Sequence, residues 1–330
     1  MNHLAQRDDN PVCADKCRIA VCIPVFNDWE SVRLVLPTLA RALADLIDVS
    51  VIIVDDGSTD MLDAASLRTT GLSLSILQLR RNVGHQRAIA IGLAAIAEKI
   101  NCDAVVVMDG DGEDNPAHVP ALLAEARRHT PASVVFAKRM RRTENLGFRV
   151  GYFCFRVLHR MLTGHPCDVG NFSVVPRVWL NRLACSSELW IHYSAAVACS
   201  RLPVSKVPCD RAHRIAGRSH MKLTSLVVHG LSAISVFSET VGVRICLALG
   251  AMAGLTIALL MAALYLRFMT DLAVPGWATY ATGLLLILLL NLLLLTTNSV
   301  LGILGARNNV GFIPSRDWSL FVSEWMTVDG

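Results

Sequence analysis

The sequence lacks the nucleotide-binding signatures that are easiest to find in a single chain. It contains no G-x-x-x-x-G-K-[ST] phosphate loop, which argues against an ordinary kinase or ATPase. No G-x-G-x-x-G follows the first predicted strand, so a dinucleotide-binding domain is disfavoured as well. The 10 cysteines include no C-x-x-C pair, which favours reduced thiols over a disulfide framework or a zinc site.

Charge is missing from two long stretches near the C-terminus. Residues 245–266 and 272–306 contain no Asp, Glu, Lys or Arg, and each stretch is long enough to cross a bilayer. The 330 residues are 53% hydrophobic with a mean hydropathy of +0.46, which is high for a purely soluble protein. Residues 1–17 are polar and lack an apolar core, so we expect a polar extension there and no secretory signal. A cytosolic domain is predicted over 18–220.

The predicted membrane segment, 243–306, is a hairpin with spans at 243–267 and 278–303. An amphipathic juxtamembrane helix is expected at 221–242, and a cytoplasmic tail at 307–330. Basic residues precede the first span and follow the second, so the positive-inside rule places both ends of the hairpin in the cytoplasm. The net charge of +4 is mild and the basic clusters lie near the membrane segment, which favours lipid headgroups or phosphates over nucleic acid as partners.

Before the membrane segment, short apolar runs alternate with amphipathic stretches. Strands are predicted at 18–24, 49–54, 72–79, 104–108, 133–137, 171–175 and 202–208, and the longer helices at 85–99, 117–129 and 147–163. This alternation predicts an α/β fold, with a Rossmann-like, mostly parallel sheet that helices cover on both faces. In such sheets, ligands bind beyond the carboxyl ends of the strands.

Polar groups follow three of these predicted strands, and the topology would bring them to one edge of the sheet. They are Asn27-Asp28, Asp55-Asp56-Gly57-Ser58 and the stretch 109–116, Asp-Gly-Asp-Gly-Glu-Asp-Asn-Pro. Carboxylates crowded at a strand end repel one another unless a cation lies among them or some stay protonated. Oxygen-only ligands favour a hard cation such as Mg²⁺ or Mn²⁺, which commonly also binds substrate phosphates.

A plainer interpretation of the acidic stretch also exists. It is a solvated turn that leads into a helix, with Asp114 or Asn115 as N-cap and Pro116 in the first turn. The convergence of three polar strand ends favours the metal site over this alternative. A nucleoside diphosphate bound through a divalent cation, with arginines adding charge-assisted contacts, suits such a site.

The ordered set of motifs resembles family 2 glycosyltransferases of the GT-A fold. The segments that carry the resemblance are 24–28 (Pro-Val-Phe-Asn-Asp), 54–60 (Val-Asp-Asp-Gly-Ser-Thr-Asp), 81–84 (Arg-Asn-Val-Gly), 109–116, 170–173 with Arg177, and 214–219. Within that family the chain is similar to the polyprenyl-phosphate glycosyltransferases that carry a two-helix membrane anchor. The resemblance covers roughly residues 18–305, and it implies a GT-A catalytic domain followed by amphipathic helices and the hairpin.

The resemblance implies a nucleotide pocket at the ends of the first two strands. The residues that would line this pocket are Pro24, Phe26, Asp28, Val54 and Asp56. The alternative role of Pro24 and Phe26 is to end the strand and pack there, and that of Asp28 is to cap the following helix.

The resemblance also implies roles within the acidic stretch. Asp109 and Asp111, on either side of Gly110, correspond to the DxD pair that contacts ribose and metal. Glu113 stands where the family often has a glutamine metal ligand. The implied cofactor is Mg²⁺ or Mn²⁺, with Asp109, Asp111 and Glu113 as its ligands.

Basic residues complete the implied site. Arg139 and Arg214 match positions that contact the diphosphate and the acceptor phosphate. The family usually has a lysine six residues after Arg214, where this chain has His220, so Lys222 is the nearest candidate for that cation. Asn171 replaces a common aspartate, which leaves Asp168 as the nearest carboxylate. The catalytic candidates are therefore Asp111, Arg139, Arg214 and Asp168.

These expectations combine into one reaction. A polyprenyl phosphate is already an anion at neutral pH, so its oxygen can attack the anomeric carbon of a GDP- or UDP-sugar without a strong general base. Direct attack predicts inversion at that carbon. We expect a multi-pass protein of the inner membrane with a cytoplasmic catalytic domain, membrane lipid as a partner, and no nucleic acid; a homo-oligomer is compatible with this arrangement.

Two other functions stay open at this stage. One is a glycosyltransferase with another lipid or glycan acceptor, and the other is a non-catalytic membrane scaffold of the same fold. The intact acidic stretch disfavours the scaffold. A processive polysaccharide synthase is disfavoured because two helices cannot form an export channel alone and the chain has no Q-x-x-R-W pattern.

Overall fold

The computed structural model describes residues 17–44, 48–67, 72–129, 131–139, 146–210, 212, 214–215, 223–270, 276–308 and 311–328. The chain divides into two compact units. The first comprises Met1–Val157, His165–Val236 and Phe312–Gly330, and the second comprises Leu158–Gly164 and Phe237–Gly311. The first unit therefore extends beyond the predicted 18–220 domain and includes a segment that follows the apolar helices.

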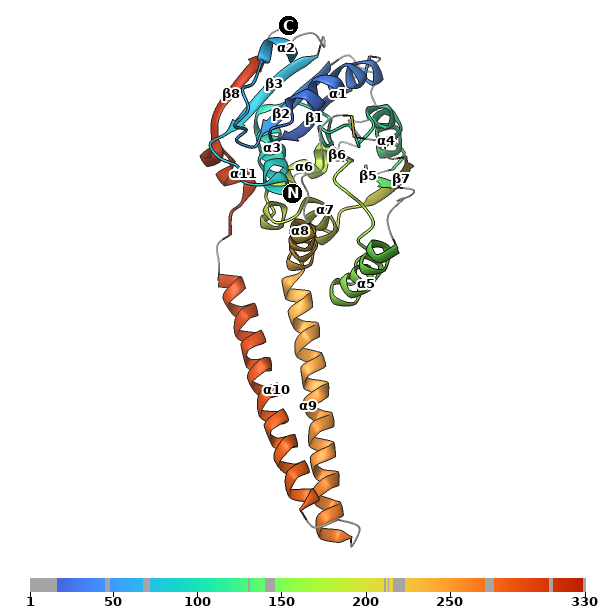
Figure 1. Ribbon diagram of the computed structural model, residues 1–330. Helices are drawn as coiled ribbons and strands as arrows, with labels where there is room; N and C mark the ends of the chain where they lie inside the picture. Colours follow the sequence, from blue (N-terminus) through green and yellow to red (C-terminus); the bar gives the residue numbers. More distant parts are fainter. Residues whose placement is uncertain are drawn as a thin grey trace, which may run out of the picture. The chain divides into compact units, whose positions relative to one another are not determined.

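Among the described residues of the first unit, eight strands form one mixed sheet in the order β7-β5-β6-β4-β1-β2-β3-β8 (Figure 1). The strands are β1 (Arg18–Val25), β2 (Asp48–Asp55), β3 (Ser73–Leu79), β4 (Ala104–Val107), β5 (Val134–Arg139), β6 (Ser173–Pro176), β7 (Val204–Cys209) and β8 (Val322–Val328). The central pairs β4–β1, β1–β2 and β2–β3 are parallel, as is β5–β7. Strand β6 is antiparallel to β4 and β5, and β8 is antiparallel to β3.

Helices cover both faces of this sheet (Figure 1). The α-helices of the first unit are α1 (Trp29–Ala42), α2 (Ala64–Leu67), α3 (His85–Lys99), α4 (Val119–Arg127), α6 (Arg177–Ala184), α7 (Tyr193–Cys199), α8 (Leu223–Ser235) and α11 (Pro314–Asp317). Short 3₁₀ turns are η3 (Pro116–His118), η4 (Ser187–Trp190) and η5 (Trp318–Phe321). Helix α5 (Leu146–Thr163) contributes residues to both units.

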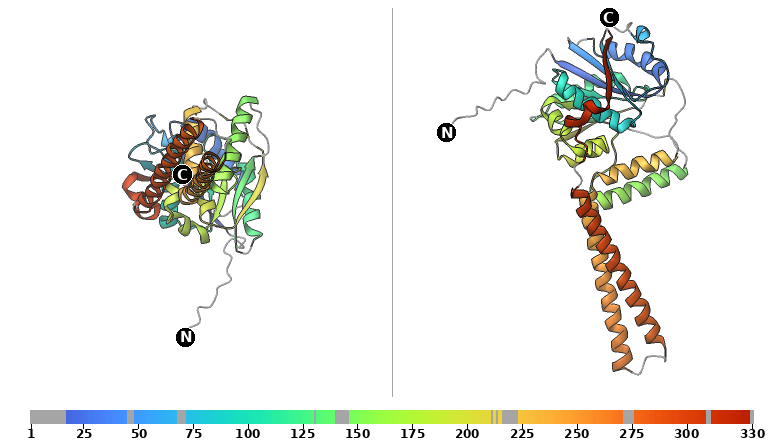
Figure 2. Two further views of the ribbon diagram at one scale, coloured as in Figure 1. Left: turned by 90° about the horizontal axis from the view of Figure 1, so that it is seen from below. Right: turned by 90° about the vertical axis from the view of Figure 1, so that its left-hand side faces the viewer.

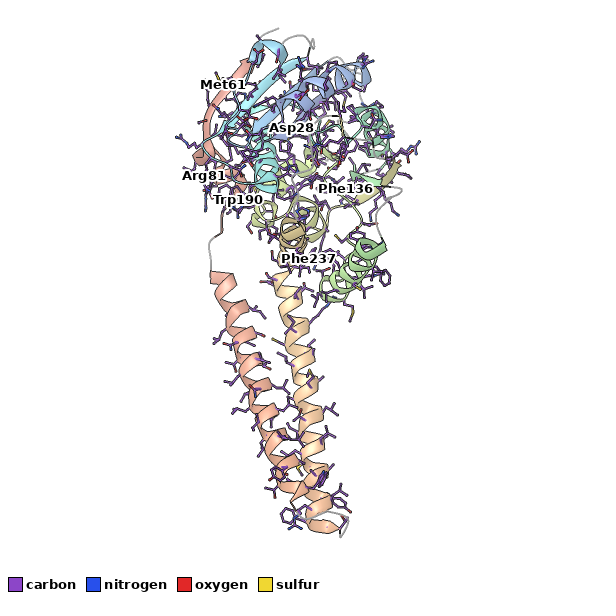
Figure 3. The ribbon with its side chains drawn as sticks, in the orientation of Figure 1. Asp28, Met61, Arg81, Phe136, Trp190 and Phe237 are labelled. Carbon is purple, nitrogen blue, oxygen red and sulfur yellow. The ribbon has the colours of Figure 1, made fainter. Side chains whose placement is uncertain are left out.

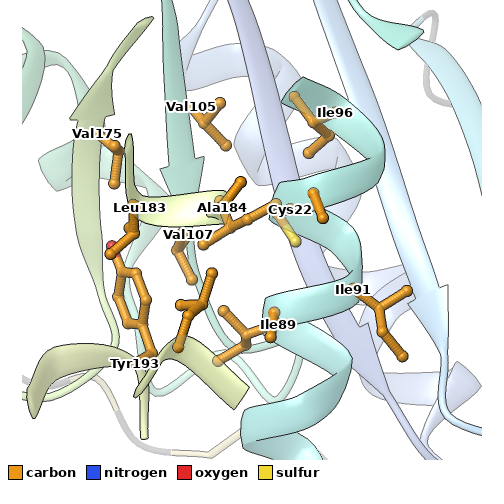
Figure 4. Packing of buried hydrophobic residues seen from close by; sticks show 14 of the residues in the cluster. Cys22, Ile89, Ile91, Ile96, Val105, Val107, Val175, Leu183, Ala184 and Tyr193 are labelled. Atoms are coloured by element: carbon orange, nitrogen blue, oxygen red, sulfur yellow. The ribbon is translucent and has the colours of Figure 1, made fainter. Parts of the chain in front are cut away.

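The core consists of two apolar layers, one on each face of the sheet. Alternate side chains of β1 point to opposite faces, so Ile19, Val21 and Ile23 pack with α1 and α4, whereas Ala20 and Cys22 pack with α3. The second layer also includes residues of α6 and α7 (Figure 4). This double coverage matches the nearly continuous apolar runs of the central strands.

Helix α3 lies unusually close to the sheet at Gly92. A Cβ atom at this position would lie 2.5 Å from Cys22 Sγ and 2.7 Å from Val54 Cγ2. Glycine therefore allows the helix axis to approach β1 and β2. The close contact fixes the N-terminus of α3, where His85 and Gln86 lie, relative to the carboxyl ends of those strands.

The second unit is dominated by two long helices, α9 (Ser238–Met269) and α10 (Trp277–Asn308), which run side by side (Figure 2). Both are long and apolar enough to cross a membrane, over Ser238–Met269 and Trp277–Gly305, and little of either is buried. At Gly242 a Cβ would lie 2.6 Å from the Ile303 side chain, so a small residue permits this contact between the helices. Arg244 Nη1 donates to the carbonyls of Met161 (2.7 Å) and Leu162 (3.0 Å) in the last turn of α5.

Two features differ from the sequence-based expectations. The predicted juxtamembrane helix at 221–242 is interrupted, because α8 ends at Ser235 and α9 begins at Ser238. The predicted tail at 307–330 contains α11, η5 and the edge strand β8. Trp318 Nε1 donates to Glu98 Oε2 at 2.8 Å, and the side chain of Trp325 packs in the same apolar layer as α3. The tail is structured because it pairs with β3 and covers α3, contacts that sequence periodicity does not reveal.

Candidate active site

The ends of β1 and β2 are joined by the side chain of Asn27. Its backbone has φ 50°, in the left-handed region that asparagine tolerates better than most residues. The Asn27 N–H donates to Ser58 Oγ (3.0 Å), and Asn27 Oδ1 accepts from the N–H groups of Thr59 (2.8 Å) and Asp60 (3.2 Å). Two of the three predicted polar strand ends are therefore connected directly.

Asp56 is buried and organises the loop that precedes α3. Its two carboxylate oxygens accept from the N–H groups of Val83 (2.7 Å) and Gly84 (2.9 Å). Burial raises the pKa of Asp56 above its ordinary value, and these two hydrogen bonds and the nearby charge of His85 partly oppose that rise. Asp56 therefore acts as the acceptor that positions the Arg-Asn-Val-Gly loop, and its predicted contact with a nucleotide stays a prediction.

The remaining pocket candidates differ in accessibility. Pro24 and Val54 are buried and occupy paired positions in β1 and β2. Phe26 is 47% exposed just beyond β1, and Asp28 follows it at the start of α1 (Figure 3). Gly110 is buried, and a Cβ there would lie 3.1 Å from both Ile23 and Val32. The structure therefore leaves Phe26 and Asp28 as the members of this group that a ligand can reach.

The acidic stretch follows β4 and divides into two parts. Asp114 is buried, and its Oδ2 accepts from the backbone N–H of Asp109 (3.0 Å). Asn115 caps η3 through a hydrogen bond from the N–H of Ala117 (3.0 Å), so the predicted capped turn is confirmed. Asp109 and Asp111 precede this turn, and their side chains are 24% and 19% exposed. Helix capping therefore explains the end of the stretch, and the beginning is available for chemistry.

A basic side chain lies beside each of these two carboxylates. His85 Nε2 lies 3.1 Å from Asp109 Oδ1. Arg214 Nη1 lies 3.6 Å from Asp111 Oδ2, and Arg214 Nη2 donates to Asp28 Oδ2 at 2.7 Å. Burial lowers the pKa of His85, but the Asp109 carboxylate and the charges of Asp114 and Asp111 outweigh that effect, so the pKa is raised above its ordinary value.

A chain of amide hydrogen bonds fixes the orientation of the groups around His85. The N–H of Tyr193 donates to Gln86 Oε1 (2.7 Å), so Gln86 Nε2 donates to Asn171 Oδ1 (3.1 Å). Asn171 Nδ2 therefore faces His85 Nε2 at 3.0 Å. Asn171 requires this nitrogen to accept, whereas Asp109 requires it to donate. A proton on His85 Nε2, in the charged ring or the neutral Nε2–H tautomer, satisfies Asp109, whereas the neutral Nδ1–H tautomer satisfies Asn171.

The other predicted site residues lie elsewhere or outside the described part of the chain. Asp168 forms a two-oxygen ion pair with Lys206 Nζ on β7, at 2.7 and 2.9 Å. Arg139 ends β5 opposite Cys209 in the β5–β7 register. Lys222 lies outside the described residues. A pocket borders the acidic stretch and is lined by Glu113, Asp114, Asn115, Ala137, Gly170, Phe172, Cys209 and Asp210.

The acidic stretch fits a divalent cation by its chemistry. Among the residues that the structure describes, no group of three or more His, Cys, Asp or Glu side chains is arranged as a metal cage. Asp109 and Asp111 nevertheless present partly exposed carboxylate oxygens, which are the ligands that Mg²⁺ and Mn²⁺ prefer. His85 and Arg214 balance these carboxylates, as a cation would.

Sequence patterns alone did not point to His85, Gln86 or His192. The available signal was the placement of His85 and Gln86 directly after the Arg-Asn-Val-Gly loop, at the N-terminus of a predicted helix. Because the first turn of α3 follows a loop that Asp56 holds in place, these two side chains are brought to the strand ends. His192 carried no comparable signal.

A mostly parallel sheet with carboxylates and an arginine gathered beyond its strand ends defines an α/β protein with a site suited to a nucleoside diphosphate and a cation. Residues 20–183 match the family described as "Glycosyl transferase family 2". Residues 20–183 therefore form a family 2 glycosyltransferase domain, and the predicted GT-A fold is confirmed.

Several curated proteins are similar to this chain, each over a different length. The chain is 27% identical over 153 residues to a dodecaprenyl-phosphate galacturonate synthase of Rhizobium johnstonii, covering 44% of this chain and 43% of the relative. It is 27% identical to an undecaprenyl-phosphate 4-deoxy-4-formamido-L-arabinose transferase of Photorhabdus laumondii, covering 49% of each. It is 24% identical to the uncharacterized glycosyltransferase YkcC of Bacillus subtilis, covering 79% of this chain and 80% of YkcC. The matches thus span less than half of the first two relatives and most of the third.

The fold also resembles solved structures. Glucosyl-3-phosphoglycerate synthase from Mycobacterium tuberculosis, in complex with Mn²⁺, UDP-glucose and phosphoglyceric acid, superposes with a TM-score of 0.52 at 21% sequence identity. The match covers 68% of this chain and 80% of that chain. This likeness shows the fold. The two apolar helices and the polyprenyl-phosphate relatives together indicate a membrane protein.

Proposed function

We propose that the protein is an inverting glycosyltransferase that moves a monosaccharide from a nucleoside-diphosphate sugar to a polyprenyl phosphate at the cytoplasmic face of the inner membrane. The observation that carries this proposal is the convergence of Asp28, Asp111 and Arg214 at the strand ends of a family 2 domain. The same chain contains two helices that can span a membrane. Two relatives named as polyprenyl-phosphate sugar enzymes support the choice of acceptor.

The donor would bind where the three polar strand ends meet. Asp109, Asp111 and Glu113 would hold Mg²⁺ or Mn²⁺, which stabilises the negative charge of the leaving nucleoside diphosphate when bound. Phe26, exposed just beyond β1, offers an apolar surface for the base. Asp28 is directed to the same region by its hydrogen bond with Arg214.

Arg214 has the charge and the geometry to exchange partners during the reaction. Its guanidinium is placed between Asp28 and Asp111, and a guanidinium can bind a phosphate by two parallel hydrogen bonds. Asp111 would hold the cation, and Arg214, still bonded to Asp28, would contact a phosphate oxygen. The arginine would then orient the acceptor for attack on the face of the sugar opposite the leaving group.

No strong general base is required by this reaction, because the acceptor phosphate is already ionised at neutral pH. Asp168 was the carboxylate predicted for such a role, and its ion pair with Lys206 supports a function in fixing the loop before β6. In-line attack by the phosphate oxygen inverts the anomeric configuration.

Apolar residues on α5 and α8 support a membrane-proximal location for the catalytic domain. Phe153 on α5 and Val228 on α8 are 65% and 62% exposed. The two helices contact each other, since a Cβ at Gly230 would lie 2.9 Å from Phe155 Cε2. Exposed apolar side chains on amphipathic helices are typical of segments that lie in the headgroup region of a bilayer.

The test is a transfer assay with the purified full-length protein in lipid nanodiscs. Undecaprenyl phosphate, Mn²⁺ and a panel of radiolabelled GDP- and UDP-sugars are supplied, and labelled lipid is extracted and counted. We expect label in the lipid with at least one donor, and an inverted anomeric configuration by NMR. Label that appears only in a different lipid or in a glycan would change the acceptor. If no nucleoside diphosphate binds with Mn²⁺, the catalytic proposal is wrong.

A further inference from the structure

Two histidines connect α8 with α7. His192 Nε2 and His229 Nε2 lie 3.2 Å apart, and the ring centroids are separated by 4.5 Å. His192 is buried and caps α7, because its Nδ1 accepts from the N–H of Ala195 at 3.4 Å. The pair therefore links the helix that precedes the first apolar span with the N-terminus of a core helix.

The hydrogen bonds define the proton positions in this pair. Since Nδ1 of His192 accepts, the single proton of the neutral ring lies on Nε2, which donates to His229. His229 Nε2 is then the acceptor, and its own proton lies on Nδ1. Burial lowers the pKa of His229, the charge of His85 lowers it further, and Asp109 partly opposes this shift. His229 is thus kept in the neutral form that can accept.

The bridge continues into the candidate active site through backbone and side-chain hydrogen bonds. Tyr193, the residue after His192, donates its N–H to Gln86, and Gln86 donates to Asn171. Asn171 contacts His85, which is paired with Asp109. A series of neighbouring polar groups therefore leads from Asp109 to the N-terminus of α7, with His85 Nε2 bonded either to Asp109 or to Asn171, and His192 extends it to α8.

Helix α8 presents two different faces. Val227, Val228 and Leu231 are exposed and apolar, whereas His229 is partly buried against His192 and Gly230 lies against Phe155. The inner side of α8 therefore packs against α5 and α7, and His229 makes the polar contact with α7. The outer side suits the hydrocarbon chain of a lipid.

We propose that His229 is a positioning residue for the lipid acceptor: its bridge to His192 fixes α8 relative to Asp109, so that a polyprenyl phosphate lying along α8 presents its phosphate at the right distance from the donor sugar. This proposal rests on the proposed function. Reacting atoms must come within about 3–3.5 Å, and a misplacement of about 1 Å can cost about 100-fold in rate. A residue that sets the height and rotation of α8 would then control use of the acceptor without contacting the donor.

Three variants separate the bridge from the folding of α7 and α8. His229→Leu removes the acceptor at similar volume, and His229→Gln keeps an acceptor oxygen near the position of Nε2. His192→Asn retains a good N-cap for α7 but is too short to reach His229. Each variant is assayed as the full chain in nanodiscs, with undecaprenyl phosphate as acceptor. Affinity for the nucleoside diphosphate with Mn²⁺ is measured by calorimetry on the same preparations.

We expect His229→Leu and His192→Asn to lower kcat/KM for undecaprenyl phosphate by about 10-fold or more, with affinity for the nucleoside diphosphate changed less than about twofold. His229→Gln should retain activity within about threefold of the parent protein. If His229 only filled space, leucine would replace it as well as glutamine does. Activity in His229→Gln but not in His229→Leu therefore indicates that the hydrogen-bond acceptor is required. If His229→Leu does not accumulate, His192→Asn supplies the same test.

Three outcomes would overturn the inference. They are unchanged acceptor kinetics in both bridge-breaking variants, an equal loss of nucleotide affinity and acceptor use, or failure of glutamine to rescue. Failure of the proposed function is recognised separately, because the parent protein would then form no labelled polyprenyl lipid with any donor. If the parent protein is active and the variants His229→Leu and His192→Asn are equally active, only the role of His229 is contradicted.

Discussion

Arg214 Nη2 donates to Asp28 Oδ2 at 2.7 Å, which joins two residues that lie 186 positions apart in the sequence. The other terminal nitrogen of the same guanidinium lies 3.6 Å from Asp111 Oδ2. One arginine thus serves the end of β1 and the end of β4 together. This geometry requires a planar group with two separated donors, which lysine does not have.

Replacing Arg214 by lysine should therefore impair catalysis even though the positive charge is kept. A single ammonium cannot reach both carboxylates or bind a phosphate by two parallel bonds, so we expect kcat/KM for the acceptor to fall by about 10- to 100-fold. Steady-state transfer to undecaprenyl phosphate measures the effect. Arg33→Lys, at an exposed position of α1, is the matched control and should leave the kinetics unchanged. Normal kinetics in Arg214→Lys would contradict the assigned role.

Asp111 and Asp114 should respond differently to the same Asp→Asn change. Asp111→Asn removes a predicted metal ligand, so we expect loss of turnover and loss of Mn²⁺-dependent nucleotide binding, with normal insertion into the membrane. Asp114→Asn alters the buried acceptor for the Asp109 N–H, so it should lower stability by about 1–3 kcal/mol. Calorimetry with and without Mn²⁺, together with unfolding midpoints, separates the two effects. Full turnover in Asp111→Asn would disprove the metal assignment.

The lowered pKa of His229 predicts a pH-dependent contribution to stability. Its ordinary value is 6.5, and the folded state favours the neutral ring. Between the lowered pKa and 6.5 the unfolded chain binds more protons, so the contribution of this group rises with pH and is lost as pH falls from about 6.5 through the folded pKa. His229→Gln should weaken that dependence.

The contribution of His85 to stability should depend on pH in the opposite direction, which provides a comparison. Its pKa is raised in the folded state, so its contribution is fully present below 6.5 and is lost as pH rises through the folded pKa. Thermal midpoints of the parent protein, His229→Gln and His85→Gln are measured from pH 5.5 to 8 in the presence of a chelator. Equal pH profiles for the two variants would contradict these assignments.

The close approach of α3 to the sheet predicts a large effect of one added methyl group. In Gly92→Ala the new Cβ meets Cys22 Sγ and Val54 Cγ2 at distances that real contacts do not reach, so the variant should be destabilised by about 1–3 kcal/mol. Gly151→Ala on α5 is the matched control, because nothing lies within 4 Å of its added Cβ. Chemical denaturation of both variants measures the difference. Equal unfolding free energies for Gly92→Ala and Gly151→Ala would contradict this prediction.

Removal of the last nine residues should destabilise the catalytic unit. Truncation after Phe321 deletes β8 and leaves the backbone groups of β3 without their antiparallel partner. We expect a lower unfolding temperature and aggregation through the newly exposed edge of β3. Light scattering and thermal unfolding check this, with a control truncation after Val328 that preserves the strand. A truncated chain as stable and monodisperse as the parent would show that β8 is dispensable.

Features that depend on local pattern follow from the order of the amino acids. Apolar runs such as 104–108 predict buried strands wherever they occur, and uncharged runs such as 272–306 predict membrane spans because of their length. Local chemistry also predicted a cap at Asp114 or Asn115, of which the structure has Asn115, and it singled out the carboxylates Asp109 and Asp111. The buried strand, the long apolar helix and the cap are confirmed, because each depends on neighbours within a few residues along the chain.

Tertiary structure alone decided how those pieces meet. The return of β8 to the sheet, the hydrogen bond between Arg214 and Asp28, and the bridge between His192 and His229 join segments that are distant in the sequence. Such contacts depend on strand order and on the close approach of helices, which no local pattern encodes. The polar residues were visible in the sequence; which of them face one another is a consequence of packing.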